Sequence, residues 1–124
     1  MLTHAPIRAY LPASDVARAR KFYEQKVGLT PKEVSDGGVT YECGGAEVFL
    51  YLTPNAGTSK ASQAFWQVTD VEAEMRDLKA RGVVFEEYDL PGVEMKNGIA
   101  VGCGAKTAWF KDTEGNILAI SQRM

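Results

Sequence analysis

Apolar and polar residues alternate with two different periods along the chain, and the same order of periods occurs twice. In the first half, residues 7–11 are typical of a strand, and residues 16–27 carry apolar side chains near helical spacing. In the second half, residues 64–68 predict a strand and residues 71–78 a helix. Residues that can cap the N-terminus precede each helix, and a glycine that can end it follows. These residues are Ser14, Asp15 and Gly28 for the first helix, and Thr69, Asp70 and Gly82 for the second.

Three further extended segments follow each predicted helix. They are residues 32–34, 39–43 and 47–52 in the first half, and residues 83–89, 105–110 and 117–121 in the second. The order strand, helix, strand, strand, strand therefore occurs twice, which predicts an α+β fold of two βαβββ modules. We expect one domain over residues 1–124, with module one at about 5–53, a linker at about 54–62 and module two at about 63–124. Residues 89–104 are expected to form a long irregular loop.

Composition narrows the class of protein. The 124 residues suffice for one domain, and 45% hydrophobic with 24% charged residues is ordinary for a globular chain. A net charge of -2 with interspersed signs gives no basic face, so we expect no nucleic-acid partner. No apolar run approaches the roughly 20 residues of a membrane span, and no secretory signal is visible, so we expect no membrane partner and a cytoplasmic location. Cys43 and Cys103 lack the spacing of a disulfide framework or a zinc site and are expected to be reduced thiols.

Several short motifs occupy defined places in this pattern. They are "SDV" and "KFY" around the first helix, "VGL" at its end, "TDV" before the second helix and "WFKDTEGNILAI" near the end of the chain. In this order and spacing the chain resembles the vicinal-oxygen-chelate superfamily, which holds the glyoxalases, extradiol dioxygenases, fosfomycin-modifying enzymes and bleomycin-binding resistance proteins. The resemblance implies that the two modules pair into a partly open barrel with the ligand in its concavity. It also implies a homodimer.

The same resemblance implies four places at which enzymes of the superfamily hold a divalent metal through His and Glu. In this chain the four places fall on Arg8, Tyr51, Ala64 and Ala119, none of which is an ordinary metal ligand. The single histidine, His4, lies upstream of the first strand. We therefore predict no catalytic metal and no cofactor.

Strand periodicity extends these places to a predicted ligand site, because residues two apart on a strand share a face. The predicted ligand-binding residues are Arg8, Tyr10, Phe49, Tyr51, Trp66 and Trp109, although the periodicity does not fix the direction of Trp109. Aromatic rings offer stacking area, and a guanidinium offers a forked donor for a carboxylate. The site is therefore expected to bind a small organic molecule that is planar or apolar and carries one anionic or carbonyl group.

Alternative interpretations stay open at this point. Arg8 can instead reach solvent or pair with an acidic side chain such as Glu47 or Glu114, and the aromatic rings can simply fill the barrel. The leading functional hypothesis is metal-free binding of a small molecule, such as antibiotic sequestration. The alternative is an enzyme of the same superfamily, a lyase, isomerase or dioxygenase that uses side-chain acid-base chemistry or an atypical metal site. A third hypothesis is an accessory module that has no cavity.

Overall fold

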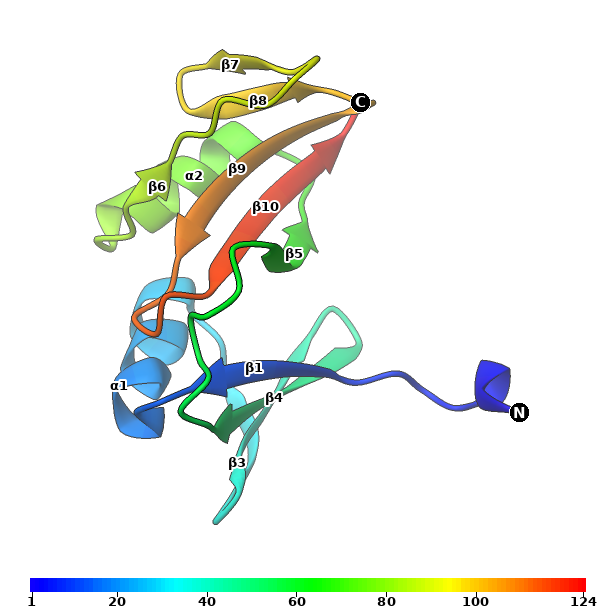
Figure 1. Cartoon of the computed structure of the whole chain (residues 1–124), viewed down its shortest axis with the longest axis vertical. Coiled ribbons are helices and arrows are strands. Elements are labelled where there is room, and N and C mark those ends of the chain that lie inside the picture. Colours follow the sequence, from blue (N-terminus) through cyan, green and yellow to red (C-terminus); the bar gives the residue numbers. More distant parts are fainter.

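Two β-sheets carry the fold, and helical segments pack against one side of each (Figure 1). The structure, a computed structural model, describes residues 1–124. The strands are β1 (Ala9–Ala13), β2 (Pro31–Ser35), β3 (Gly38–Cys43), β4 (Ala46–Leu52), β5 (Ser62–Gln67), β6 (Phe85–Glu86), β7 (Glu94–Lys96), β8 (Ile99–Gly102), β9 (Ala105–Lys111) and β10 (Ile117–Arg123). The helical segments are η1 (Leu2–His4), α1 (Val16–Lys21), η2 (Phe22–Val27) and α2 (Val71–Ala80). None of them is both long and apolar enough to span a membrane.

The strand order repeats between the modules. Sheet A has the order β1-β4-β3-β2, and sheet B has the order β5-β10-β9-β8-β7 with β6 paired to β9. In each sheet the first strand of the module runs parallel to the last one and forms an edge of the sheet. The α+β fold of two βαβββ modules with a partly open sheet arrangement, predicted from the sequence, is thus confirmed.

Both helices begin where their capping residues predict. The Asp15 carboxylate accepts a hydrogen bond from the Arg18 amide, and the Asp70 carboxylate accepts one from the Ala73 amide, each at 3.0 Å. The first helix widens into the π-helical segment η2, and Gly28 then ends it in the left-handed conformation at φ 87°. The two predicted helices are confirmed, with this one irregularity.

The predicted loop at residues 89–104 is wrong in part, because a hairpin of β7 and β8 lies within it. Asn97 and Gly98 form its two-residue turn, with φ angles of 55° and 80°. Positive φ at both positions is typical of the tight turn that joins antiparallel strands, and Asn-Gly is its most common sequence. The predicted strand at residues 83–89 also shortens to β6, which covers two residues.

One hydrophobic core joins the two sheets. Leu11, Val39 and Leu50 supply it from sheet A, while Phe110 and Leu118 supply it from sheet B. The buried residues of α1, η2 and α2 belong to the same cluster. Because these inner faces of the sheets share a core, their opposite faces point away from each other within one chain.

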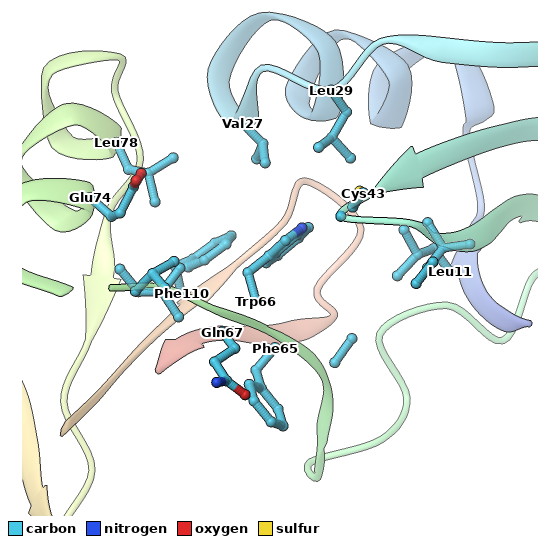
Figure 2. Close-up of a pocket in the computed structure, with 16 residues that line it drawn as sticks. Leu11, Val27, Leu29, Cys43, Phe65, Trp66, Gln67, Glu74, Leu78 and Phe110 are labelled. Atoms are coloured by element: carbon cyan, nitrogen blue, oxygen red, sulfur yellow. The ribbon is translucent and has the colours of Figure 1, made fainter. Parts of the chain in front are cut away.

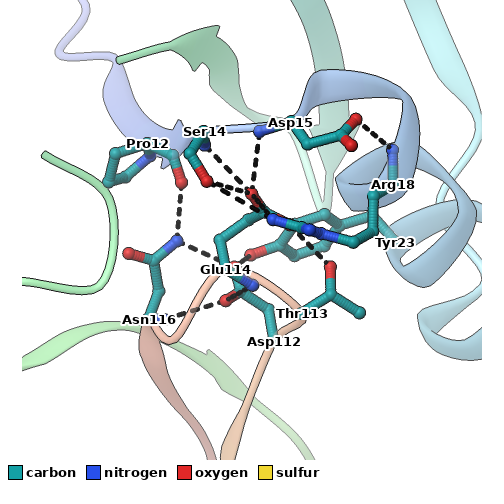
Figure 3. Close-up of polar contacts among 9 residues, drawn as sticks. All are labelled: Pro12, Ser14, Asp15, Arg18, Tyr23, Asp112, Thr113, Glu114 and Asn116. Carbon is teal, nitrogen blue, oxygen red and sulfur yellow. Dashed lines mark hydrogen bonds and ion pairs between the residues drawn. The ribbon is translucent and has the colours of Figure 1, made fainter. Parts of the chain in front are cut away.

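A buried carboxylate fastens the β9–β10 turn of module two to module one (Figure 3). The Glu114 side chain has no exposed surface. It accepts hydrogen bonds from the Ser14 and Asp15 amides at 2.9 and 3.0 Å, and from the Arg18 guanidinium at 2.8 and 3.0 Å. The Thr113 hydroxyl donates a further bond at 2.9 Å. We call this contact between the modules the Glu114 latch.

Asp112, in the same β9–β10 turn, adds further hydrogen bonds beside the Glu114 latch. Its carboxylate accepts hydrogen bonds from the buried Tyr23 hydroxyl and from the Glu114 and Asn116 amides. The Asn116 side chain in turn donates to the Pro12 carbonyl at 2.7 Å, and its oxygen accepts from the Gly57 amide at 3.3 Å. The turn therefore holds η2, the end of β1 and the linker at once.

Burial alone would raise the pKa of Glu114, but hydrogen bonds from Arg18, Asp15 and Thr113 outweigh it and lower the pKa from 4.5 to about 2. A group with a lowered folded-state pKa stabilises the protein above its unfolded pKa, and the contribution is lost as the pH falls toward the folded pKa. A shift of this size corresponds to about 3 kcal/mol.

We expect the free energy of unfolding to fall between pH 4.5 and 2, and Glu114→Gln to remove part of that slope. At pH 7 the substitution should lower the free energy of unfolding by about 1.5–3 kcal/mol, because a neutral amide loses the charge-assisted hydrogen bonds from Arg18 and the backbone amides. Urea unfolding across this pH range measures both effects. The control is Glu33→Gln, which neutralises an exposed carboxylate and should leave the slope unchanged. A Glu114→Gln profile that matches the unsubstituted protein would contradict the role of the latch.

Candidate functional site

An aromatic patch covers the outer face of sheet A. Tyr10 on β1 lies against Phe49 and Tyr51 on β4, with ring centroids 6.2 and 4.8 Å apart. Leu11 and Leu50, which alternate with these residues along β1 and β4, point into the core. Because successive side chains on a strand point to opposite faces, the three rings point away from the core. Tyr10 is 62% exposed, so this patch is an open surface rather than part of the interior. With Arg8, these residues form what we call open face A.

Charged side chains border the patch. The Arg8 guanidinium lies 3.4 Å from a Glu47 carboxylate oxygen, and the Lys32 ammonium lies 3.0 Å from both Glu47 and Glu42. The hydrogen bond from Lys32 lowers the pKa of Glu47, and the two carboxylates raise the pKa of Lys32. The pairing of Arg8 with Glu47 is confirmed, while pairing with Glu114 is wrong because the latch occupies that carboxylate. Arg8 remains 48% exposed, which leaves room for a second acceptor.

A second aromatic surface lies on the outer face of sheet B. Phe65 on β5 pairs with Ala119 on β10, which pairs with Trp109 on β9. The Trp109 ring packs edge-on against Tyr88 at 5.7 Å, and its indole N–H donates to the Ser62 hydroxyl at 3.1 Å. Phe65 is 64% exposed. We call Phe65, Tyr88, Trp109 and Ala119 open face B.

The predicted direction of Ala64 and Trp66 is wrong by one residue. Ala64 pairs with Leu118 and Trp66 with Ile120, so both face the core rather than the open side. The distance in sequence from each capping residue back to its strand indicates which residues are equivalent in the two modules. Tyr10 precedes Asp15 by the same interval as Phe65 precedes Asp70, and both lie on open faces. Phe65 is thus the residue that the strand periodicity missed.

Tyr88 is the other residue that the sequence prediction missed. Its hydroxyl is the one buried side-chain polar atom without a hydrogen-bond partner in the protein. Burial and the neighbouring Glu86 carboxylate raise the pKa of this phenol, which keeps it a donor. Since it follows a strand of two residues, no periodicity in the sequence indicates its position.

Trp66 instead lines a cavity of about 510 Å³ on the core side of the sheets (Figure 2). The cavity lies between the end of η2, the helix α2 and the inner faces of both sheets. The structure therefore brings Arg8, Tyr10, Phe49 and Tyr51 together on one surface and places Trp109 on another. Trp66 belongs to neither surface.

The side chains at the four places of the implied metal site do not fit a divalent cation. Arg8 and Tyr51 lie on open face A, Ala119 lies on open face B, and Ala64 lies in the core. No group of three or more His, Cys, Asp or Glu side chains is placed to hold a metal ion.

The family model described as Glyoxalase/Bleomycin resistance protein/Dioxygenase superfamily matches residues 5–120. No curated protein matches the sequence.

Solved structures share the fold at low sequence identity. The chain is 22% identical to TnmS3, an antibiotic binding protein from Streptomyces sp. CB03234, over 100% of this chain and 99% of that one, with a TM-score of 0.68. A glyoxalase/bleomycin resistance protein/dioxygenase from Alicyclobacillus acidocaldarius is 18% identical over 98% and 92% of the two chains, with a TM-score of 0.74. Lactoylglutathione lyase from Agrobacterium tumefaciens is 17% identical over 96% and 93%, with a TM-score of 0.69.

Proposed function

The chain belongs to the Glyoxalase/Bleomycin resistance protein/Dioxygenase superfamily, and we propose that it binds a small aromatic or anionic organic molecule without the metal site of the superfamily's enzymes. The observation that carries this proposal is open face A, where three exposed or half-buried rings adjoin a half-exposed guanidinium. Rings provide area for stacking, and the guanidinium provides donors for a carboxylate or carbonyl. Antibiotic sequestration is the form of this function that we favour, since TnmS3 is an antibiotic binding protein with the same fold over its whole length.

The ionisable groups of open face A favour binding over acid-base catalysis. Catalysis at neutral pH needs a group whose pKa lies near 7. Here the Lys32 hydrogen bond lowers the pKa of Glu47, and Glu42 and Glu47 raise the pKa of Lys32, so both shifted groups move away from neutrality. The one histidine of the chain, His4, lies outside both open faces.

We further propose that the site is completed in a homodimer. The first strand of each module, β1 and β5, has an unpaired edge, and unpaired edges readily accept another strand. Each edge lies beside an open face that leaves apolar rings in water, with Tyr10 62% and Phe65 64% exposed. Pairing β1 of one chain with β5 of a second copy would join open face A and the partner's open face B into one continuous surface, and the twist of the joined sheet would curl this surface around a ligand.

Aromatic carboxylic acids are the first ligands to test. In a thermal-shift panel of aromatic acids and antibiotics, we expect at least one compound to raise Tm, because a ligand that binds the folded state stabilises it. Arg8→Ala should weaken the most effective aromatic acid by about 10- to 100-fold, as expected for a lost charge-assisted hydrogen bond of about 1.5–3 kcal/mol.

Two further variants distinguish a direct contact between Arg8 and the ligand from an effect of the protein's net charge. Glu47→Gln should tighten the same acid a few-fold, because it removes the carboxylate that competes for Arg8. Arg76→Ala, an exposed change of equal charge on α2, should leave affinity unchanged. A panel in which no compound raises Tm would contradict the binding function itself.

Metal content tests the proposal that the chain binds its ligand without a metal site. We expect purified protein to contain well below one divalent metal ion per chain, since no cluster of ligands is formed. Elemental analysis after dialysis measures this content directly. Near-stoichiometric metal that a chelator removes with a loss of ligand affinity would overturn the metal-free proposal.

Sedimentation equilibrium tests the dimer. At micromolar concentration we expect a mass of twice the 13.5 kDa chain. Phe65→Lys should shift the equilibrium toward the single chain, because a lysine on an edge strand opposes further pairing. Val84→Lys changes a comparably exposed apolar residue away from both edges and should not. A single-chain mass for the unsubstituted protein would argue against the shared site.

A further inference from the structure

The cavity beside Trp66 lies on the core side of the sheets and borders open face B at one residue, Phe65, which also lines the cavity. It borders the inner faces of the sheets, through Leu11 and Val48 of sheet A and Phe110 and Ile120 of sheet B. Those four residues turn away from the aromatic rings of the open faces. No residue of open face A lines the cavity, so a ligand on that face would leave the cavity unfilled.

The size of the cavity suits a small organic molecule. Its volume is about 510 Å³, and it opens to solvent where Ala46, Phe65 and Glu74 of its lining are exposed. The surrounding core is tight, since Leu11 is 1% exposed and Phe110 is 0% exposed. Pockets that hold small organic molecules run from roughly 300 to 1,000 Å³. The volume lies in this range, as do those of two other hollows of about 700 and 540 Å³, and the apolar lining distinguishes the Trp66 cavity from them.

The walls of the cavity suit a flat aromatic molecule. Thirteen of its 16 lining residues are hydrophobic. Figure 2 shows Trp66 near the centre, with Val27 and Leu29 above it, Leu78 to the left and Leu11 to the right. The Trp66 ring already stacks on Phe110, at 6.2 Å and 14° between planes, which holds the indole in place. Offset stacking of a ligand ring against such an indole is a favoured arrangement.

The one charged group at the cavity, the exposed Glu74, favours a cation. Glu74 is the one charged residue among those that line it, and Gln67 is the one amide. Glu74 forms no ion pair within the protein, whereas the neighbouring Glu72 is paired with Lys106 at 3.2 Å. A carboxylate beside an apolar cavity, with no basic residue in the lining, favours a protonated amine over an anion.

We propose that this cavity is a second binding site, for a flat aromatic molecule that carries a cationic amine. The aromatic system would lie against Trp66 between η2 and α2, and the amine would point toward the Glu74 carboxylate. This ligand class is opposite in charge to the aromatic acid proposed for open face A. The second site does not depend on the first.

The two tryptophans allow each site to be observed separately. Trp109→Phe leaves Trp66 as the only indole and reports on the cavity, while Trp66→Phe leaves Trp109 and reports on open face B. The probe is 9-aminoacridine, a planar cation at pH 7. We expect it to quench Trp66 fluorescence in Trp109→Phe saturably, and to quench Trp109 in Trp66→Phe no more than it quenches free N-acetyltryptophanamide.

Substitutions around the cavity provide the controls. In the Trp109→Phe background, Glu74→Gln should weaken 9-aminoacridine about fivefold to tenfold, and Glu72→Gln on the same helix should leave its affinity unchanged. Ala46→Phe, at an exposed position of the lining, should block access and abolish saturable quenching. Equal affinities for the Glu74 and Glu72 variants would overturn the role assigned to Glu74.

One further outcome identifies a different occupant. Trp66 could remain unquenched in the dimer and be quenched only after dilution to the single chain. In that case a second copy covers the cavity, and the proposal of a ligand site in the assembled protein is wrong. Failure of an aromatic acid to bind at open face A would leave the Trp66 result unaffected. The two proposals therefore fail independently.

Discussion

The fold depends on one buried carboxylate that links the two modules. Glu114 lies in the turn between β9 and β10, yet the Ser14 and Asp15 amides and the Arg18 guanidinium all come from the β1–α1 junction of module one. With every acceptor position occupied, the charge can be buried at little cost, and its directional bonds fix how the turn sits on the first module. The shared core of the sheets then packs behind this contact.

The shared core determines which surfaces stay open to ligands. Because the helix-covered sides of both sheets pack into this core, the aromatic surfaces on their other sides point apart in a single chain. Neither surface encloses a ligand by itself, although each offers rings and one of them offers a guanidinium. We therefore propose an enclosed site between copies of the chain, whereas the Trp66 cavity lies within one copy.

Most of the fold can be predicted from short sequence patterns. The candidate sites depend on contacts between residues far apart in the sequence, which short patterns do not reveal. The caps Asp15 and Asp70 and the terminating Gly28 were predictable because each acts within a few residues of itself. The Asn97-Gly98 turn was equally local and was overlooked. By contrast, Glu114 binds residues about 100 positions away, and the direction of Trp66 depends on which side of β5 meets the core. The aromatic cluster of open face A was predictable because the family resemblance placed Arg8 and Tyr51, and strand periodicity on β1 and β4 extended these places to Tyr10 and Phe49.

Mixing two defective variants tests the shared site most directly. One variant would carry Arg8→Ala and Tyr10→Ala on open face A, and the other would carry Trp109→Ala on open face B. The measurement is the number of binding sites for the most effective aromatic acid, by equilibrium dialysis, before and after the two are mixed and allowed to exchange subunits. If the site lies between copies, each variant alone binds nothing, and the mixture recovers about a quarter of the normal capacity because half of its dimers hold one intact site. Capacity that stays at zero after confirmed subunit exchange would contradict a site shared between copies.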